Sequence, residues 1–334
     1  MRHIFRNTSS LSRGYLIVLT GTALWSTTAI IIRHLNDAFG MSAMAVAFWR
    51  DFWVSLLLWG FFALFNPAVL RLRREEHGFL LWFGLLLAVF NSLWTISVKV
   101  NGAAVSTVLI YSSAAFTALY ERWFQKMPLG LAKGTAILLS LAGSVLAAEA
   151  YTAASWKLNP WGLALGLLSA IAFTVYSLVG KQAAVRRINS WTALVYSFSA
   201  AVVFLGVFNL LEDHLSPQAT LARLTVLGAS WEGWGWMILL AAVPSIGGYG
   251  LYTLSLRYLR ASVSNLIATL EPSMTALLAY LLLGERFSLA QLGGGLLILA
   301  GVVLVRYGEG GEVRRPDGSG KRARPDGSRR PVRS

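Results

Sequence analysis

The chain has 334 residues, of which 56% are hydrophobic and 13% charged, and its net charge is +14. Soluble domains have about a quarter of their residues charged, so this composition indicates a membrane protein. The sequence contains no cysteine, which excludes disulfides and thiolate chemistry. The four histidines, His3, His34, His77 and His214, fall in polar connecting segments, and we expect neither a metal site nor a cofactor.

Ten apolar runs are long enough to cross a hydrocarbon core of about 30 Å as helices. Open strands cannot span lipid, so we predict an all-α integral membrane protein with ten transmembrane helices. Arg2, Arg6 and Arg13 precede the first run as in a signal peptide, but its length and the nine runs that follow indicate a retained span. The predicted spans are 15–32, 43–65, 79–98, 102–120, 129–148, 160–180, 190–209, 234–256, 261–283 and 289–305.

The basic residues predict the orientation. With the N-terminus in the cytoplasm, few Lys or Arg residues lie between spans on the outer side: Arg33, Lys99, Lys157, Arg223 and Arg286. The positive-inside rule therefore places both termini in the cytoplasm, in an inner (cell) membrane, and nucleic acid is not an expected partner. Residues 307–334 contain the motif RPDGS twice and are predicted to be a disordered basic cytoplasmic tail, either a solvated anchor or a ligand of anionic lipid head groups.

The chain repeats itself under a shift of 158 residues. The stretch ISVKVNGAAVSTVLIYSSAAFTAL then lies over LSLRYLRASVSNLIATLEPSMTAL, and LAKGTAILLSLAGSVL lies over LAQLGGGLLILAGVVL. Each half holds five spans, so the second half must enter the membrane from the opposite side. We therefore predict two inverted five-helix repeats, 1–149 and 150–306, with a binding site near the midplane where they meet.

These features resemble the EamA-type transporters of the drug/metabolite transporter superfamily. The likeness rests on FWR in the second span and on LEPSMTALLAYLLLGERFSLAQLGGGLLILAGVVL over the last two, although Lys126 and Met127 stand where the second half has Gly284 and Glu285. The resemblance implies a central cavity lined mainly by the first, third, fourth, sixth, eighth and ninth helices. It also implies export of amino acids or other metabolites.

Glu271 and Pro272 interrupt the apolar ninth span near the predicted bilayer centre. Pro272 removes a backbone hydrogen bond, which predicts a kink with an exposed carbonyl next to a titratable acid. Glu271 either handles a proton or a substrate cation, or it holds the kink by a hydrogen bond to a neighbouring helix. Asn265 and Thr269 lie on one face of this span and Glu271 on the other, and the sequence leaves open which face lines the cavity.

Polar aromatic residues and asparagine predict a substrate pocket. The repeat places Tyr249 and Tyr252 at positions equivalent to Asn91 and Trp94, and Trp25, Tyr111 and Tyr176 lie within other predicted spans. If they converge, they form an apolar box suited to an aromatic ring or an ammonium group. The alternative for each residue is core packing or lipid contact.

Arg50 and Asp51 lie inside the second span. They form either a structural ion pair or a contact for a substrate carboxylate.

The combined prediction is a secondary transporter, with no enzyme activity, that exports an amino acid or related metabolite by alternating access. Protons would be a coupling partner and a homodimer is possible. A membrane scaffold or receptor and an integral membrane enzyme are the alternatives; acidic pairs occur only in loops, which counts against the enzyme.

Overall fold

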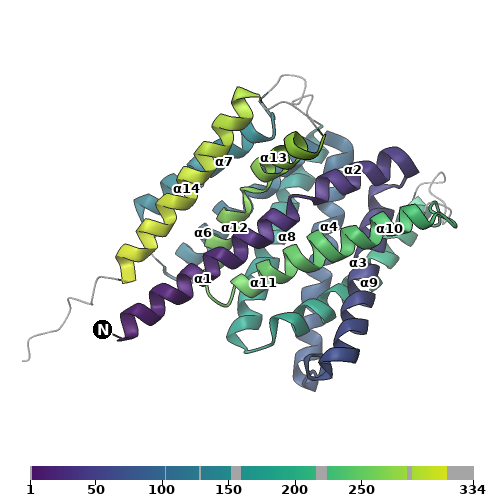
Figure 1. The fold of residues 1–334 in the computed structure, drawn as a ribbon, viewed down its shortest axis with the longest axis horizontal. Helices are drawn as coiled ribbons and strands as arrows, with labels where there is room; N and C mark the ends of the chain where they lie inside the picture. Colours follow the sequence, from purple (N-terminus) through teal and green to yellow (C-terminus); the bar gives the residue numbers. More distant parts are fainter. Residues whose placement is uncertain are drawn as a thin grey trace, which may run out of the picture.

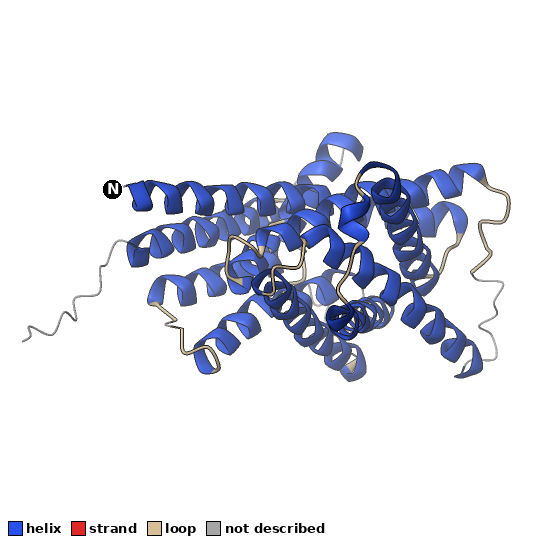
Figure 2. Ribbon diagram, turned by 90° about the horizontal axis from the view of Figure 1, so that it is seen from below, coloured by secondary structure: helices blue, strands red, loops and turns tan. Residues whose placement is uncertain are grey.

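A computed structural model describes residues 2–101, 103–127, 129–151, 159–215, 224–283 and 288–313, and the described residues form helices and turns without a strand (Figures 1 and 2). The helices are α1 (Arg2–Trp25), α2 (Thr28–Phe39), α3 (Ala43–Phe65), α4 (His77–Asn101), α5 (Ala103–Tyr111), α6 (Ser113–Trp123), α7 (Leu131–Ala147), α8 (Pro160–Val185), α9 (Ser190–Leu215), α10 (Trp231–Leu240), the π-helical η4 (Ala241–Tyr249), α11 (Gly250–Ser255), α12 (Ala261–Ala268), α13 (Glu271–Leu283) and α14 (Leu289–Val313). Short 3-10 turns, η1 (Pro67–Leu70) and η2 (Arg74–Glu76), connect α3 to α4.

Seven helical stretches among the described residues are long and apolar enough to cross a membrane: Leu11–Phe39, Met44–Phe65, Arg74–Val98, Pro160–Val185, Ser190–Leu211, Trp231–Ser255 and Leu289–Arg306. The predicted spans 102–120, 129–148 and 261–283 correspond to shorter helices: α5 with α6, the 17-residue α7, and α12 with α13. The all-helical membrane architecture is therefore confirmed, and ten crossings remain a prediction.

Three predicted spans are interrupted near their middle. The first breaks between Trp25 and Thr28, the fourth at Ser112, and the ninth at Thr269 and Leu270, so that α13 begins at Glu271. Pro272 predicts the last of these breaks, whereas the prediction of unbroken helices for the first and fourth spans is wrong. Ser112 and Leu270 are 158 residues apart, so the interruptions in α5/α6 and α12/α13 fall at equivalent positions of the sequence repeat.

Side-chain hydroxyls explain the first interruption. Ser26, Thr27 and Thr28 donate in turn to the carbonyls of Ala23, Leu24 and Trp25, at 2.7, 2.7 and 2.5 Å. Ser and Thr hydroxyls that occupy nearby carbonyls compete with the helical ladder and bend it. Three such residues in succession stop α1, and α2 starts again almost in line with it (Figure 1).

The helix α10, the π-helical stretch η4 and α11 form one long rod beside α1 and α2 (Figure 1). Proline at position 244 cannot donate to Leu240 and its ring crowds that carbonyl. The Leu240 carbonyl instead accepts a hydrogen bond of 2.9 Å from the Ser245 hydroxyl. Gly248 lets α1 approach closely, because a Cβ there would lie 3.2 Å from the Cβ of Trp25. The glycines after Pro244 thus allow close packing.

The repeat-related helices α7 and α14 pack against each other along one side of the molecule (Figure 1). Their backbones nearly touch, because a Cβ on Gly294 would lie 2.5 Å from the Gly143 carbonyl oxygen and 2.5 Å from the Ala147 nitrogen. Small residues that allow such approach are typical of helix pairs in membranes. The predicted tail begins later than expected, since α14 continues to Val313; residues 314–334 lie outside the described part.

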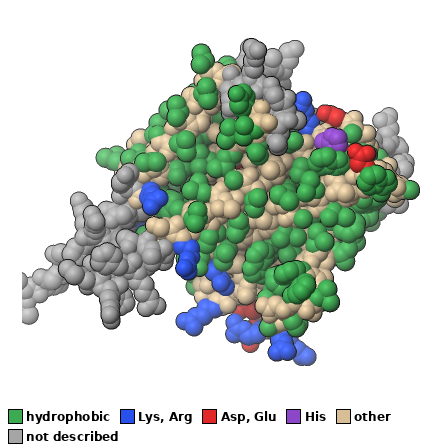
Figure 3. All heavy atoms as spheres, in the orientation of Figure 1, with side chains coloured by type: hydrophobic (Ala, Val, Ile, Leu, Met, Phe, Trp, Pro, Cys, Tyr) green, Lys and Arg blue, Asp and Glu red, His purple; other side chains and the backbone are tan. Residues whose placement is uncertain are grey.

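Basic side chains gather along the edge of the molecule near the N-terminus, and an apolar surface covers most of the face shown (Figure 3). The helix α2, at the opposite end in Figure 1, contains His34, Arg33 and Asp37, the last two 3.8 Å apart. This separation agrees with the charge count from which the cytoplasmic location of the termini is predicted. The edge where the Lys and Arg side chains gather is the basic end of the molecule.

Replacing Gly294 by alanine should destabilise the protein, because the added Cβ meets backbone atoms that cannot move aside. Overpacking of this kind costs about 1–3 kcal/mol. Gly293 is the matched control, since nothing lies within 4 Å of a Cβ built there. We expect Gly294→Ala to lower the thermal unfolding temperature in detergent and Gly293→Ala to leave it unchanged or raise it. Equal temperatures for both variants would contradict the packing described here.

Candidate functional site

The interrupted helices meet one another. The Tyr111 hydroxyl, at the end of α5, donates to Glu271 Oε2 at 3.1 Å. The Thr275 hydroxyl, one turn into α13, donates to the Ser26 carbonyl at 2.9 Å, an acceptor left available where α1 ends. Backbone that leaves the helical pattern inside lipid is tolerated only where protein or a water-filled cavity supplies its hydrogen bonds. The three interruptions therefore define a common interior region.

Aromatic rings fill this region. The ring of Trp25 lies 4.4 Å from that of Tyr249 and 5.8 Å from that of Tyr252, between centroids. Phe173 lies 5.7 Å from Tyr252 and 6.0 Å from Tyr176. All five rings are buried and come from α1, α8, η4 and α11. Four of them are residues that the sequence analysis expected to converge; Phe173 was not named there, because a phenylalanine in an apolar helix has no distinguishing pattern.

A buried network of polar side chains adjoins the rings. Asn265 Nδ2 donates to Thr117 Oγ1 at 2.8 Å, and Asn265 Oδ1 accepts from Ser177 Oγ at 3.1 Å. The Tyr252 hydroxyl is hydrogen-bonded to Asn265 Oδ1 and lies 2.7 Å from Ser177 Oγ. Four helices, α6, α8, α11 and α12, are thus joined through one amide. In α12 the face containing Asn265 turns toward this network.

An ion pair lies inside α3. Arg50 Nε donates to Asp51 Oδ1 at 2.9 Å, and Asn91 Nδ2 of α4 donates to Asp51 Oδ2 at 3.2 Å. Both charged side chains are buried, and Arg50 Nη2 has no hydrogen-bond partner among the described residues. Tyr249 belongs to η4, which packs against both α3, the helix of the ion pair, and α1, and its ring lies 4.4 Å from that of Trp25.

Two expected site residues are placed differently from the rest. Trp94 is partly buried against the core and makes no ring contact with the aromatic cluster among the described residues. Thr269 is fully buried, and its hydroxyl donates to the Leu266 carbonyl of its own helix at 2.6 Å. Thr269 thus contributes to ending α12, and its hydroxyl proton is used in that hydrogen bond.

Several residues of this region were not singled out as site residues. Ser177 and Thr117 complete the Asn265 network, and Ser26 and Thr275 join α1 to α13. A signal existed for two of them, since Thr117 and Thr275 are related by the 158-residue shift. Isolated Ser and Thr residues are common in packed membrane helices, so their partners become visible only in the folded chain.

The basic end of the molecule is closed by hydrogen bonds in which one charged side chain accepts and another donates. Glu121 of α6 accepts from the Ser262 backbone nitrogen at 3.2 Å and from the Ser262 hydroxyl at 2.5 Å, which caps the start of α12. Lys181 of α8 donates to the carbonyls of Leu256 and Leu259, at 2.7 and 2.8 Å, after the end of α11. These bonds tie the segments around α11 and α12 to their neighbours.

The opposite end is closed by apolar packing. Leu35 of α2 and Met237 of α10 lie in a second hydrophobic cluster. Trp49 packs edge-on against Trp234, with centroids 4.8 Å apart, and its Nε1 donates to the Leu224 carbonyl at 2.6 Å. The two ends thus differ in chemistry, and the aromatic cluster and the ion pair lie between them.

Comparison with known proteins identifies the class. A 304-residue alignment with the inner membrane transporter YicL of Salmonella typhimurium, named as uncharacterized, is 24% identical and covers 89% of this chain and 96% of that protein. A transporter of Archaeoglobus fulgidus, also named as uncharacterized, is 23% identical over 87% of this chain and 95% of its own. The threonine/homoserine exporter RhtA of Salmonella typhimurium is 24% identical over 76% of this chain and 78% of its own.

A solved crystal structure superimposes with a TM-score of 0.70 over 91% of this chain and 99% of that chain, at 17% identity, and shows that the fold is shared. The fold and these relatives define a multi-pass cell membrane transporter for a small molecule. The model of the EamA-like transporter family matches residues 12–148 and again residues 160–307. The chain belongs to the EamA-like transporter family.

Removal of one member of the buried ion pair should cost more stability than removal of both. Asp51→Asn leaves the Arg50 charge without its counterion, and breaking a buried pair costs about 3–5 kcal/mol. Thermal unfolding in detergent should show a large loss for Asp51→Asn. Part of that loss should be recovered in the Arg50→Gln/Asp51→Asn double variant. A double variant whose loss equals the sum of the two single losses would show that the residues do not stabilise each other.

Proposed function

We propose that the protein exports an amino acid or a related small metabolite by alternating access, with two inverted five-helix repeats moving about the interrupted helices. The observation that supports this most directly is that the breaks after α1 and α5 both contact the first turns of α13, through Thr275 and Glu271. Broken helices at the midplane of inverted repeats form the substrate sites of many secondary transporters. The two separate family matches and the equivalent breaks at Ser112 and Leu270 support the repeat.

The charges around the aromatic cluster suit a zwitterion. The free Nη2 of Arg50 offers a donor to a carboxylate, and Glu271 offers an acceptor to an ammonium group. The rings of Trp25, Tyr249 and Tyr252 supply an apolar wall that suits an aromatic side chain. RhtA is named as an exporter of threonine and homoserine, which supports this substrate class and the outward direction.

Substrate entry requires the rings to separate, because Trp25, Tyr249 and Tyr252 are buried against one another. Opening the basic end would release Ser262 from Glu121, and opening the other end would part Trp49 from Trp234. Hydrogen bonds of charged side chains hold the first end, whereas the second is held by apolar contacts and by the hydrogen bond from Trp49 to the Leu224 carbonyl. This arrangement provides two gates, and alternating access requires that they open in turn.

Glu271 is the group through which we propose proton coupling. A carboxylate far inside the membrane is costly unless it is paired, hydrated or protonated, and the described hydrogen bond to it comes from the neutral Tyr111 hydroxyl. Proton binding would neutralise the Glu271 carboxylate when the ammonium group of the substrate leaves it. The proton and the ammonium group would then bind to the same carboxylate in turn.

The proton hypothesis is tested with purified protein in proteoliposomes. Counterflow with threonine, homoserine and the aromatic amino acids first identifies a substrate. An imposed pH gradient should then accelerate net transport by the native protein, whereas Glu271→Gln should retain exchange and lose the response to the gradient. Glu75→Gln, which alters an exposed carboxylate in η2, is the control and should still respond. A Glu271→Gln protein that responds like the native one rejects proton coupling through this residue.

The aromatic wall is tested by the substrate concentration that gives half-maximal exchange. Trp25→Ala should raise it by about twofold to tenfold, the equivalent of an aromatic contact of about 0.5–1.5 kcal/mol. Trp94→Ala removes an equally large side chain outside the cluster and should have a smaller effect. An unchanged value for Trp25→Ala, or a larger change for Trp94→Ala, would assign the cluster to packing.

A further inference from the structure

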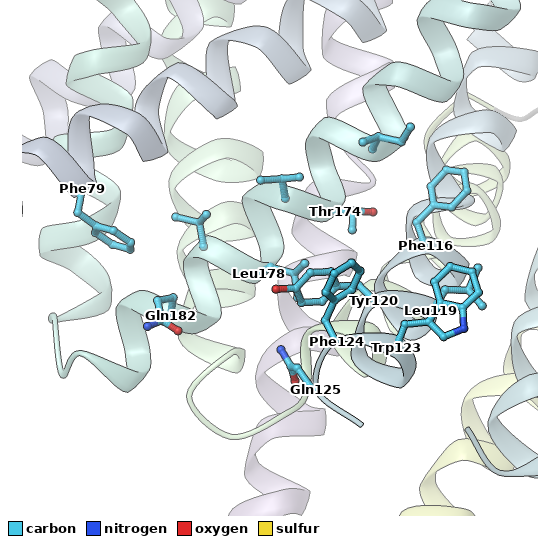
Figure 4. Close-up of a pocket in the computed structure, with 13 residues that line it drawn as sticks. Phe79, Phe116, Leu119, Tyr120, Trp123, Phe124, Gln125, Thr174, Leu178 and Gln182 are labelled. Atoms are coloured by element: carbon cyan, nitrogen blue, oxygen red, sulfur yellow. The ribbon is translucent and has the colours of Figure 1, made fainter. Parts of the chain in front are cut away.

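A groove of about 560 Å³ runs between α4, α6 and α8, apart from the candidate site (Figure 4). Its floor is one face of α8 from Ile171 to Gln182. Phe79 forms one wall, and Tyr120 and Phe124, whose rings are stacked with centroids 4.9 Å apart, belong to the other. The groove lies toward the basic end, because it uses the first residues of α4, the last turns of α6 and the last turns of α8.

The groove opens to the side of the helix bundle. Trp123 and Phe124 are 68% and 72% exposed, and Ile171 on the floor is 47% exposed. Exposed aromatic and aliphatic groups at this position of a membrane protein face hydrocarbon. A depression in such a surface is not filled by water, because water is absent from the bilayer core. A lipid acyl chain is the apolar group that the surroundings supply.

The end of the groove is polar and positively charged. Gln125 and Gln182 line the mouth from its two sides (Figure 4). One turn beyond Gln182, the guanidinium of Arg186 lies 4.4 Å from the centroid of the Phe79 ring, and its Nη1 is 3.1 Å from Glu76 Oε2.

Glu76 also forms an ion pair with Arg73, whose Nη2 lies 3.6 Å from Glu76 Oε1. One carboxylate between two guanidiniums leaves a net positive charge at the mouth. The side chain of Arg186 is 42% exposed, so this charge can meet a ligand. Basic pockets between helices at a membrane surface recognise anionic lipid head groups.

We propose that this groove is a binding site for an anionic phospholipid. One acyl chain lies along α8 between Phe79 and the stacked rings of Tyr120 and Phe124. The phosphate is held by Arg186, with the amides of Gln125 and Gln182 as further donors. The order of the groups fits an amphiphile, because the apolar part of the groove leads toward the membrane interior and its charged end lies at the basic edge of the molecule.

The site would act on the interrupted helices. Thr174 on the floor of the groove donates to the Ser113 carbonyl at 3.3 Å, at the first residue of α6. The same carbonyl accepts from Thr117, the partner of Asn265. A lipid acyl chain in the groove therefore contacts α6, and α6 must move if the α5/α6 interruption is a hinge.

The test is native mass spectrometry of the full chain, purified in detergent and supplied with equal amounts of dioleoylphosphatidylglycerol and dioleoylphosphatidylcholine. The native protein should retain the anionic lipid preferentially. Arg186→Gln should reduce this preference by about fivefold, the effect of one basic residue near an anionic surface. Arg186→Lys should keep most of it. Arg71→Gln removes an exposed charge outside the groove and should leave the preference unchanged.

A second variant tests the groove separately from the charge. Val175→Trp adds volume to the floor where space is available, and it should reduce retention of both lipids without lowering the unfolding temperature. Equal retention of the two lipids by the native protein overturns the proposal. Unchanged retention in both Arg186→Gln and Val175→Trp also overturns it. Loss of a dimer in Val175→Trp with no loss of lipid would assign the groove to a second copy of the chain instead.

Discussion

The hydrocarbon interior offers no hydrogen bonds, and this constraint governs the structure. Each place where a helix is interrupted needs a local replacement for the lost backbone bond. Ser26, Thr27 and Thr28 supply it at the end of α1, and Ser245 supplies it to the carbonyl opposite Pro244. The interruptions can therefore lie deep in the bundle, where Tyr111 and Thr275 connect them.

The same constraint explains why polar groups in the described interior occur in linked sets. Asp51 is held by Arg50 and Asn91, and Asn265 by groups from three other helices. A buried polar group without partners is costly, so each set locks its helices in one arrangement. Groups that keep free hydrogen-bonding capacity, such as Arg50 Nη2, are where a solute can add a contact without displacing a structural one.

Closure of the two ends by different chemistry has a mechanical consequence. Hydrogen bonds such as those of Glu121 and Lys181 depend on direction and break within a short displacement, whereas the packing of Trp49 against Trp234 is lost gradually as area is exposed. A transporter that opens both ends in turn must balance these two costs. In the proposed mechanism, the interrupted helices between the ends pass movement from one end to the other.

The sequence by itself determined the membrane class, the family, most helix positions and the break before Glu271, because hydropathy, the EP-containing motif and proline act locally along the chain. It also singled out Trp25, Tyr176, Tyr249 and Tyr252, because polar aromatic residues within predicted spans suit a small-molecule site, and their convergence was decided by the fold. Only the tertiary structure decided that Trp94 stands apart from the cluster and that Ser26, Thr117 and Ser177 complete the interior contacts. A hydroxyl in an apolar helix can bond to its own backbone or to a neighbour, and the choice depends on which helix packs against it.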